Sequence, residues 1–109
     1  YTFLYLRNES GWVWDHFQPS PPMSTYLVAF TISDFESLSS NSTTGPVFKV
    51  WAPKDDLPKA QYALEVAQEI LPFFEEYFGI NYPLPKLDMV AIPSFGTDAM
   101  ENWGLICFR

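Results

Sequence analysis

Nine consecutive residues near the end of the sequence carry the side chains best suited to chemistry: Asp98-Ala99-Met100-Glu101-Asn102-Trp103-Gly104-Leu105-Ile106. The segment places the Glu101 carboxylate between a thioether and an amide, after one apolar strand-like run and before another. An acidic side chain at such a strand edge can receive a cation from outside the fold. The central Ala-Met-Glu-Asn also fits a plain polar turn between two strands, which is the usual identity of so short a stretch.

Two apolar runs flank this segment and must position it. Residues 87–92 and residues 105–108 are β-prone, and we expect them to be neighbouring strands joined by the segment that carries Glu101. Cys107 lies in the second run, where the expected role is that of a small buried apolar residue. A single cysteine provides neither a disulfide framework nor a metal-ligand spacing.

A long helix is expected before these two strands. It should begin near Asp55 and Asp56, with Pro58 in its first turn, and end at Gly79. Its apolar face is predicted from residues that recur at three- and four-residue spacing: Ala60, Ala63, Leu64, Ala67, Ile70, Leu71, Phe74 and Phe78. Pro72 has no N–H to donate within the helix, so it is expected to kink or split it.

The first half of the chain is β-like. Residues 26–32 form a continuous β-prone stretch that suits a strand buried on both faces. Residues 47–51 are predicted to form a strand with Phe48 and Val50 on one face and the other three side chains on the opposite face. Between these runs, residues 37–45 are rich in Ser and Thr and are expected to form a polar loop.

Composition and charge exclude some classes of partner. Thirteen acidic residues against six basic ones give a net charge of −7, and a chain without a basic patch is not expected to bind nucleic acid. The hydrophobic fraction of 48% argues against disorder, yet no apolar stretch reaches the ~18 residues of a membrane span. His16 is the single histidine, so a structural role is expected for it. The sequence runs from Tyr1 to Arg109 without a targeting segment, and we expect it to be a fragment of a longer protein.

Two tripeptides fit the N-glycosylation acceptor pattern and give a hint of compartment. They are Asn8-Glu9-Ser10 and Asn41-Ser42-Thr43. Asn41 is the better candidate, because a glycan in its polar loop would not disturb packing. The pattern favours an extracellular or cell-surface location.

Several motifs together resemble the aminopeptidase N family of zinc metallopeptidases, the gluzincins that include membrane alanyl aminopeptidase. Pro93-Ser94-Phe95, the Ala-Met-Glu-Asn core and the following Trp-Gly-Leu resemble the exopeptidase signature of that family. Residues 23–30, 50–53 and 82–88 resemble three further segments of the family, in the family's order. The Trp-rich residues 11–17 have the look of insect gut members.

The resemblance implies an α+β fold shared between two domains. Residues 1–53 would be the end of an N-terminal antiparallel β-domain, and residues 54–109 the start of a thermolysin-like catalytic domain. In the family, the Glu at the position of Glu101 binds the free amino group of a peptide substrate. The resemblance places further substrate-binding residues on the same strand edge: Asp98, Ala99, Met100 and Asn102. The parent protein would release N-terminal amino acids from peptides, with zinc as cofactor and with a membrane anchor.

Two departures from the family pattern bear on activity. The family's zinc ligands, a His-Glu-x-x-His helix and a later Glu, have no counterpart in the sequence, so the chain itself is not expected to hold the catalytic zinc. Asp98 stands where the family has Gly, which costs about 1–3 kcal/mol if the site demands φ > 0. Alternatively, the loop is rebuilt around Gly96 and Thr97, or the parent protein has lost peptidase activity.

Three functional interpretations therefore stay open from the sequence. The chain is a piece of a zinc aminopeptidase, a piece of a non-catalytic cell-surface binding or receptor ectodomain of the same family, or a structural fragment without chemistry. An intact His-Glu-x-x-His helix further along the parent sequence would favour the first interpretation. A broken one would favour the second.

Overall fold

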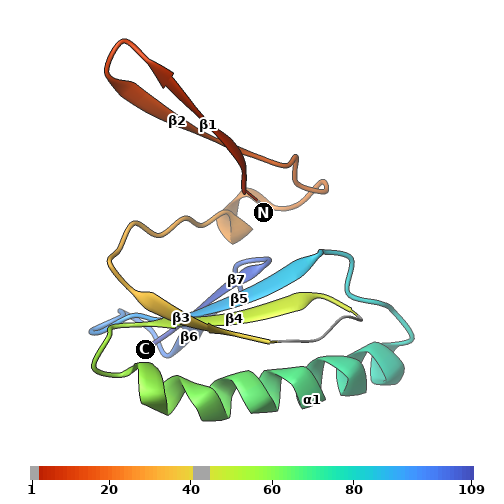
Figure 1. Cartoon of the computed structure of the whole chain (residues 1–109). Coiled ribbons are helices and arrows are strands. Elements are labelled where there is room, and N and C mark those ends of the chain that lie inside the picture. The colour runs from red at the N-terminus through yellow and green to blue at the C-terminus, as the bar shows by residue number, and fades with distance from the viewer. Residues whose placement is uncertain (1–2, 41–44) are drawn as a thin grey trace.

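The protein folds as an α+β unit of two sheets and one long helix. The computed structural model describes residues 3–40 and 45–109. Strands β1 (Phe3–Glu9) and β2 (Trp12–Phe17) form a two-stranded sheet. The second sheet has the order β3-β4-β5-β7-β6, from strands β3 (Glu36–Ser39), β4 (Val47–Ala52), β5 (Lys86–Ala91), β6 (Ala99–Met100) and β7 (Leu105–Phe108). Helix α1 (Ala60–Phe78) lies against one face of this sheet, and the β1–β2 hairpin lies on its other side (Figure 1).

The strands of the large sheet run in mixed directions. β3 pairs antiparallel with β4, whereas β4 with β5 and β5 with β7 are parallel pairs. The predicted pairing of residues 87–92 with residues 105–108 is confirmed, since Met89 lies opposite Ile106 and Val90 opposite Cys107. The chain between these two strands crosses over and forms β6 on the far side of β7.

The core lies between α1 and the sheet. Alternate residues of β4 are buried, and they include Phe48 and Val50, as the alternating pattern predicts. Leu87 and Met89 of β5 and Leu64 of α1 complete the contact in the same buried cluster. The buried residues therefore hold α1 across the two central strands that precede the Glu101 segment.

Helix α1 ends with the expected signal, but it begins later than predicted. Its first residue is Ala60 rather than one near Asp55 and Asp56, and its first turn holds no carboxylate. A 3-10 turn at Leu57–Lys59, with proline in its first positions, leads into the helix. Gly79 ends it with a φ of 65°, a left-handed conformation that glycine adopts without a Cβ penalty. The predicted split at Pro72 is wrong, because α1 is continuous through that residue. Leu71, beside the proline, packs against the core and holds the helix across the missing hydrogen bond.

The predicted apolar face of α1 contacts the sheet over only part of its length. Ile70, Phe74 and Phe78 are exposed, although the periodicity assigns them to the buried face. A helix of 19 residues is about 28 Å long, whereas a strand of six residues spans about 20 Å. The last turns of α1 therefore extend beyond the strands that cover its beginning.

The prediction of a buried strand at residues 26–32 is wrong. Thr25–Leu27 form a 3-10 turn, and the chain then runs without a strand partner to β3. Phe30 is 84% exposed and Ile32 is 91% exposed. β-prone side chains do not make a strand unless a neighbour supplies the ladder of hydrogen bonds, and none of the described strands pairs with this stretch.

The predicted polar loop at residues 37–45 is shorter than expected. Glu36–Ser39 form β3, which pairs with β4 so that Leu38 lies opposite Val50 and packs against the core. One apolar side chain among polar ones is too little for a periodic signal, whereas the backbone of β4 provides a pairing partner. Residues 41–44, which include the candidate glycosylation site Asn41, lie outside the described residues.

The sheet also bears on the predicted division of the chain. β4 lies before the expected boundary at residues 53 and 54, and α1 and β5 lie after it, yet all three share one core. The fold therefore groups β3 and β4 with α1 and the strands β5 to β7, whereas the predicted division assigns them to different domains. The division into two domains itself stays a prediction.

Candidate functional site

The segment that carries Glu101 lies at the edge of the five-stranded sheet. Its strand β6 pairs antiparallel with β7, with Ala99 opposite Phe108 and Met100 opposite Cys107. β6 is the last strand in the sheet order, so among the described strands its other side has no partner. Such an edge presents backbone N–H and C=O groups that an extended peptide can pair with.

Glu101 directly follows β6 and is exposed. Within residues 3–40 and 45–109, its carboxylate has no hydrogen bond or ion pair. The side chain is thus a negative charge at the end of an unpaired strand edge. That arrangement can bind a cation carried by the end of a peptide that lies along the edge.

Asn102 faces inward, unlike its neighbour Glu101. It is only 6% exposed, and its Nδ2 donates to the backbone carbonyl oxygen of Tyr26 over 3.4 Å. The structure therefore gives Asn102 a contact that ties the segment to residues far away in the chain. The substrate-binding role that the family resemblance implies for Asn102 stays a prediction.

A tight turn follows Asn102 and leads into β7. The backbone N–H of Leu105 donates to the Asn102 carbonyl oxygen over 3.0 Å. Gly104 has a φ of 84°, which is the conformation that the third position of a type II turn requires. A Cβ built at Gly104 would meet Leu84 Cδ1 at 3.0 Å, so the turn is also packed tightly from outside.

Two residues of β5 hold this turn, and the sequence analysis did not identify them. Lys86 Nζ donates to the Gly104 carbonyl oxygen over 2.8 Å, and the backbone N–H of Asp88 donates to the same oxygen over 3.1 Å. Lys86 Nζ also contacts Asp88 Oδ2 at 2.9 Å. The signal in the sequence is the Lys-x-Asp spacing, because residues two apart on a strand share a face.

Asp98 does not have the backbone strain considered for it. The non-glycine residues with positive φ in the described chain are Ser10 and Ser94, so the cost that a demanding φ would impose is absent at Asp98. Its carboxylate instead pairs with Arg109 Nη2 at 2.5 Å, and its carbonyl oxygen accepts from the Arg109 N–H over 3.0 Å. Both side chains are largely exposed, so the ion pair contributes about 0–1 kcal/mol. Gly96 also lacks a positive φ. The alternative of a loop rebuilt around Gly96 and Thr97 stays a hypothesis.

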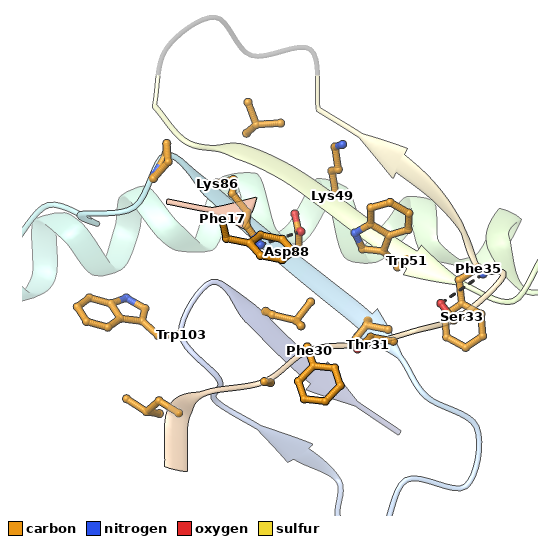
Figure 2. A pocket seen from close by; sticks show the side chains of 16 residues that line it. Phe17, Phe30, Thr31, Ser33, Phe35, Lys49, Trp51, Lys86, Asp88 and Trp103 are labelled. Atoms are coloured by element: carbon orange, nitrogen blue, oxygen red, sulfur yellow. Dashed lines mark hydrogen bonds and ion pairs between the residues drawn. The ribbon is translucent and has the colours of Figure 1, made fainter. Parts of the chain in front are cut away.

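A pocket of about 770 Å³ lies on the sheet face opposite α1, and Glu101 does not line it. The chain between β2 and β3 forms one wall with Phe30 and Phe35, and the sheet contributes Trp51. Figure 2 shows Lys86 joined to Asp88 on the sheet side of the pocket, with Lys49 beside Trp51 on the neighbouring strand. The pocket and the sheet edge at Glu101 are therefore different features. Trp103, in the turn that follows Glu101, lines the pocket.

The described residues do not fit a zinc centre. Within residues 3–40 and 45–109, no three His, Cys, Asp or Glu side chains gather in an arrangement that could hold a metal ion. His16 lies in β2, and Cys107 is buried in β7 as the sequence predicts. Burial raises the pKa of the Cys107 thiol, which opposes the thiolate that a metal binds.

Comparison with known proteins identifies relatives. Residues 62–109 match the Peptidase family M1 domain. The chain is 50% identical to endoplasmic reticulum aminopeptidase 2 of Bos taurus over 104 residues, which are 95% of this chain and 11% of that protein. It is 52% identical to endoplasmic reticulum aminopeptidase 1 of Homo sapiens over 99 residues, 91% of this chain and 10% of that protein. It is 46% identical to glutamyl aminopeptidase of Homo sapiens over 101 residues, 93% of this chain and 11% of that protein.

The chain thus spans about a tenth of the length of these curated relatives. All three relatives are mammalian, so they lend no support to the resemblance to insect gut members. Their alignments extend over at least 91% of the chain, so they reach well beyond the residues that the family model matches.

Proposed function

Because the chain belongs to peptidase family M1, we propose that it is a segment of a zinc-dependent aminopeptidase that releases N-terminal amino acids from peptides. The observation that carries this proposal is the exposed carboxylate of Glu101 at the end of the unpaired strand edge β6. An enzyme that removes terminal residues must favour a free amino group over an internal peptide bond. A carboxylate at the end of a strand edge meets that requirement.

In this proposal the peptide lies along β6 as an added strand. The backbone of Ala99 and Met100 pairs with the peptide backbone, which orients the first residues of the substrate. The N-terminal ammonium then meets the Glu101 carboxylate in a charge-assisted hydrogen bond, worth roughly 1.5–3 kcal/mol net. Asp98, two residues before Met100, lies near the same edge, where its carboxylate pairs with Arg109.

The zinc of such an enzyme would be held outside the described residues. Family M1 is zinc-dependent in general, and we propose that the ligands lie elsewhere in the longer protein. The segment described above contributes substrate binding and orientation. Its own residues neither hold the metal nor activate water in this proposal.

The purified longer protein tests the proposal directly. We expect it to hydrolyse an aminoacyl anilide with a free amino group and to leave the N-acetylated anilide intact, because only the former can pair with Glu101. Initial rates on both substrates, before and after removal of metal with a chelator, provide the measurement. Turnover of the N-acetylated substrate at a similar rate would contradict the proposal. Binding of free-amine peptides without turnover would instead favour the non-catalytic ectodomain of the same family.

We also propose that the longer protein enters the secretory pathway and acts at the cell surface or outside the cell. The support is the pair of acceptor tripeptides at Asn8 and Asn41, of which Asn8 is exposed in β1 close to the hairpin turn. Two relatives carry the endoplasmic reticulum in their names. None of the helices within residues 3–40 and 45–109 is long and apolar enough to cross a bilayer.

Asn41 should carry a glycan when the longer protein is made in a secretory host. The acceptor site Asn41-Ser42-Thr43 follows Ser40, at the point where the chain leaves β3. Peptide mapping with and without glycosidase treatment measures the occupancy of the site. Protein that carries glycans elsewhere but none at Asn41 would contradict the prediction.

A further inference from the structure

The structure points to Lys86 as a positioning residue for Glu101, a role that rests on the substrate-binding function proposed above for Glu101. Lys86 lies on β5, whereas Glu101 directly follows β6. The tight turn at residues 102–105 begins next to Glu101, and Lys86 contacts it. We propose that the Lys86 ammonium fixes this turn through the Gly104 carbonyl oxygen, and thereby fixes the direction in which Glu101 leaves strand β6.

Two hydrogen bonds meet at one oxygen of the turn. The Gly104 carbonyl accepts from Lys86 Nζ over 2.8 Å and from the Asp88 N–H over 3.1 Å, so both of its lone pairs are used. Lys86 bonds across a separation of 18 residues, from the start of β5 to the end of the turn. The Gly104 oxygen is therefore bound to two residues of β5, the central strand of the sheet. The turn cannot move without breaking these two hydrogen bonds.

The Lys86 side chain lies in a largely buried environment beside Asp88. The side chains of Lys86 and Asp88 are only 18% and 15% exposed, and they lie 2.9 Å apart. The Asp88 carboxylate holds the ammonium in place, while its own Oδ1 is buried without a partner among the described residues. A partly buried ion pair with one unsatisfied oxygen is poor evidence for stability. A positioning role accounts for its location next to the turn.

The path along the chain from the turn to the Glu101 carboxylate is short. Glu101 is followed by the buried Asn102, whose side chain donates to the Tyr26 carbonyl oxygen, and then by the turn that Gly104 closes. The segment after Glu101 is thus held at two points, and Lys86 provides the charged one. On the other side, strand β6 holds it through two residue pairs with β7, and Asp98 adds its contacts with Arg109.

A lysine on the next strand provides a matched control. Lys49 lies on β4 opposite Asp88, and its ammonium lies 5.6 Å from the centre of the Trp51 ring. Figure 2 shows both lysines on the wall of the same pocket. Lys49→Met removes the same charge from the same sheet face without touching the Gly104 carbonyl.

The experiment compares variants of the full-length enzyme. Lys86→Met is made together with Asp88→Asn, so that no buried carboxylate is left unpaired, and Asp88→Asn alone is the reference. We expect faster amide hydrogen exchange in residues 101–105 and a KM for free-amine substrates raised about tenfold, with a smaller change in kcat, because a small misplacement of a binding group is costly. Lys49→Met should change neither quantity.

Coupling to Glu101 separates positioning from a general structural effect. In a Glu101→Gln background, the Lys86 change should raise KM by less than about twofold, because the group that it positions no longer carries a charge. A full tenfold rise in that background would overturn the proposal. Lys86→Gln, whose side chain ends short of the Gly104 carbonyl, has the same expected results and replaces the Met variant if that variant does not fold.

Two further outcomes distinguish this inference from the proposed function. If exchange and KM are unchanged in the Lys86 variants while Glu101→Gln loses activity, Lys86 has no positioning role and the function of Glu101 stands. If Glu101→Gln keeps full activity while exchange in residues 101–105 still rises in the Lys86 variants, the proposed substrate-binding function fails. In that case Lys86 does fix the turn, but its role in positioning Glu101 for substrate binding is overturned.

Discussion

Glu101→Gln in the longer protein should lower kcat/KM for peptides with a free N-terminal amine by roughly ten- to a hundredfold or more. Glutamine keeps the shape of the side chain and one acceptor oxygen but removes the negative charge. The ion pair with the substrate ammonium is then lost, and the ammonium can donate only to a neutral amide oxygen. Because Glu101 is exposed and has no partner among the described residues, the substitution should leave the fold intact.

Three measurements make this test specific. The effect should be much smaller for inhibitors that lack the amino group, since these gain nothing from the carboxylate. Zinc content should not change, because Glu101 is not a metal ligand in the proposal. Glu69→Gln, an equal change of charge at an exposed position of α1, should retain the original kcat/KM. Unchanged kcat/KM in Glu101→Gln would exclude the amine-binding role, and loss of zinc would show that the residue was assigned to the wrong function.

Gly104→Ala should destabilise the protein by about 1–3 kcal/mol. Gly104 is buried with a φ of 84°, and a Cβ there would meet Leu84 Cδ1 at 3.0 Å. Alanine therefore has to adopt a strained backbone conformation and also displace the side chain of Leu84, which is itself buried. The midpoint of thermal unfolding of the domain that contains the sheet should fall accordingly.

Two other glycines calibrate this result. Gly79 has a φ of 65° but open space around its Cβ position, so Gly79→Ala tests the backbone term alone. Gly96 has neither a positive φ nor a close neighbour, so Gly96→Ala should be neutral or slightly stabilising. We expect the loss of stability to increase in the order Gly96, Gly79, Gly104. An equal midpoint for the Gly96 and Gly104 variants would contradict the close packing of the turn.

The candidate site could be predicted from sequence only in part. The acidic residue between two strand-like runs identified the segment, and the structure places that segment at a sheet edge. The contacts that support it could not be predicted, because Lys86 bonds to a carbonyl oxygen and backbone acceptors leave no mark in the sequence. The backbone strain considered for Asp98 could not be decided from the sequence either. The φ of that residue depends on how the whole crossover from β5 to β7 is closed.

The sequence by itself determined the features that depend on near neighbours in the chain. The presence of helix α1 followed from its apolar spacing and its end from Gly79. The two faces of β4 followed from strict alternation, because both periodicities arise from local backbone geometry. Only the tertiary structure decided which β-prone stretches become strands. Residues 26–32 have the stronger β-prone composition but no strand partner among the described residues, whereas the mostly polar β3 pairs with β4. A strand exists only when a distant segment completes its hydrogen bonds, and that condition is not local.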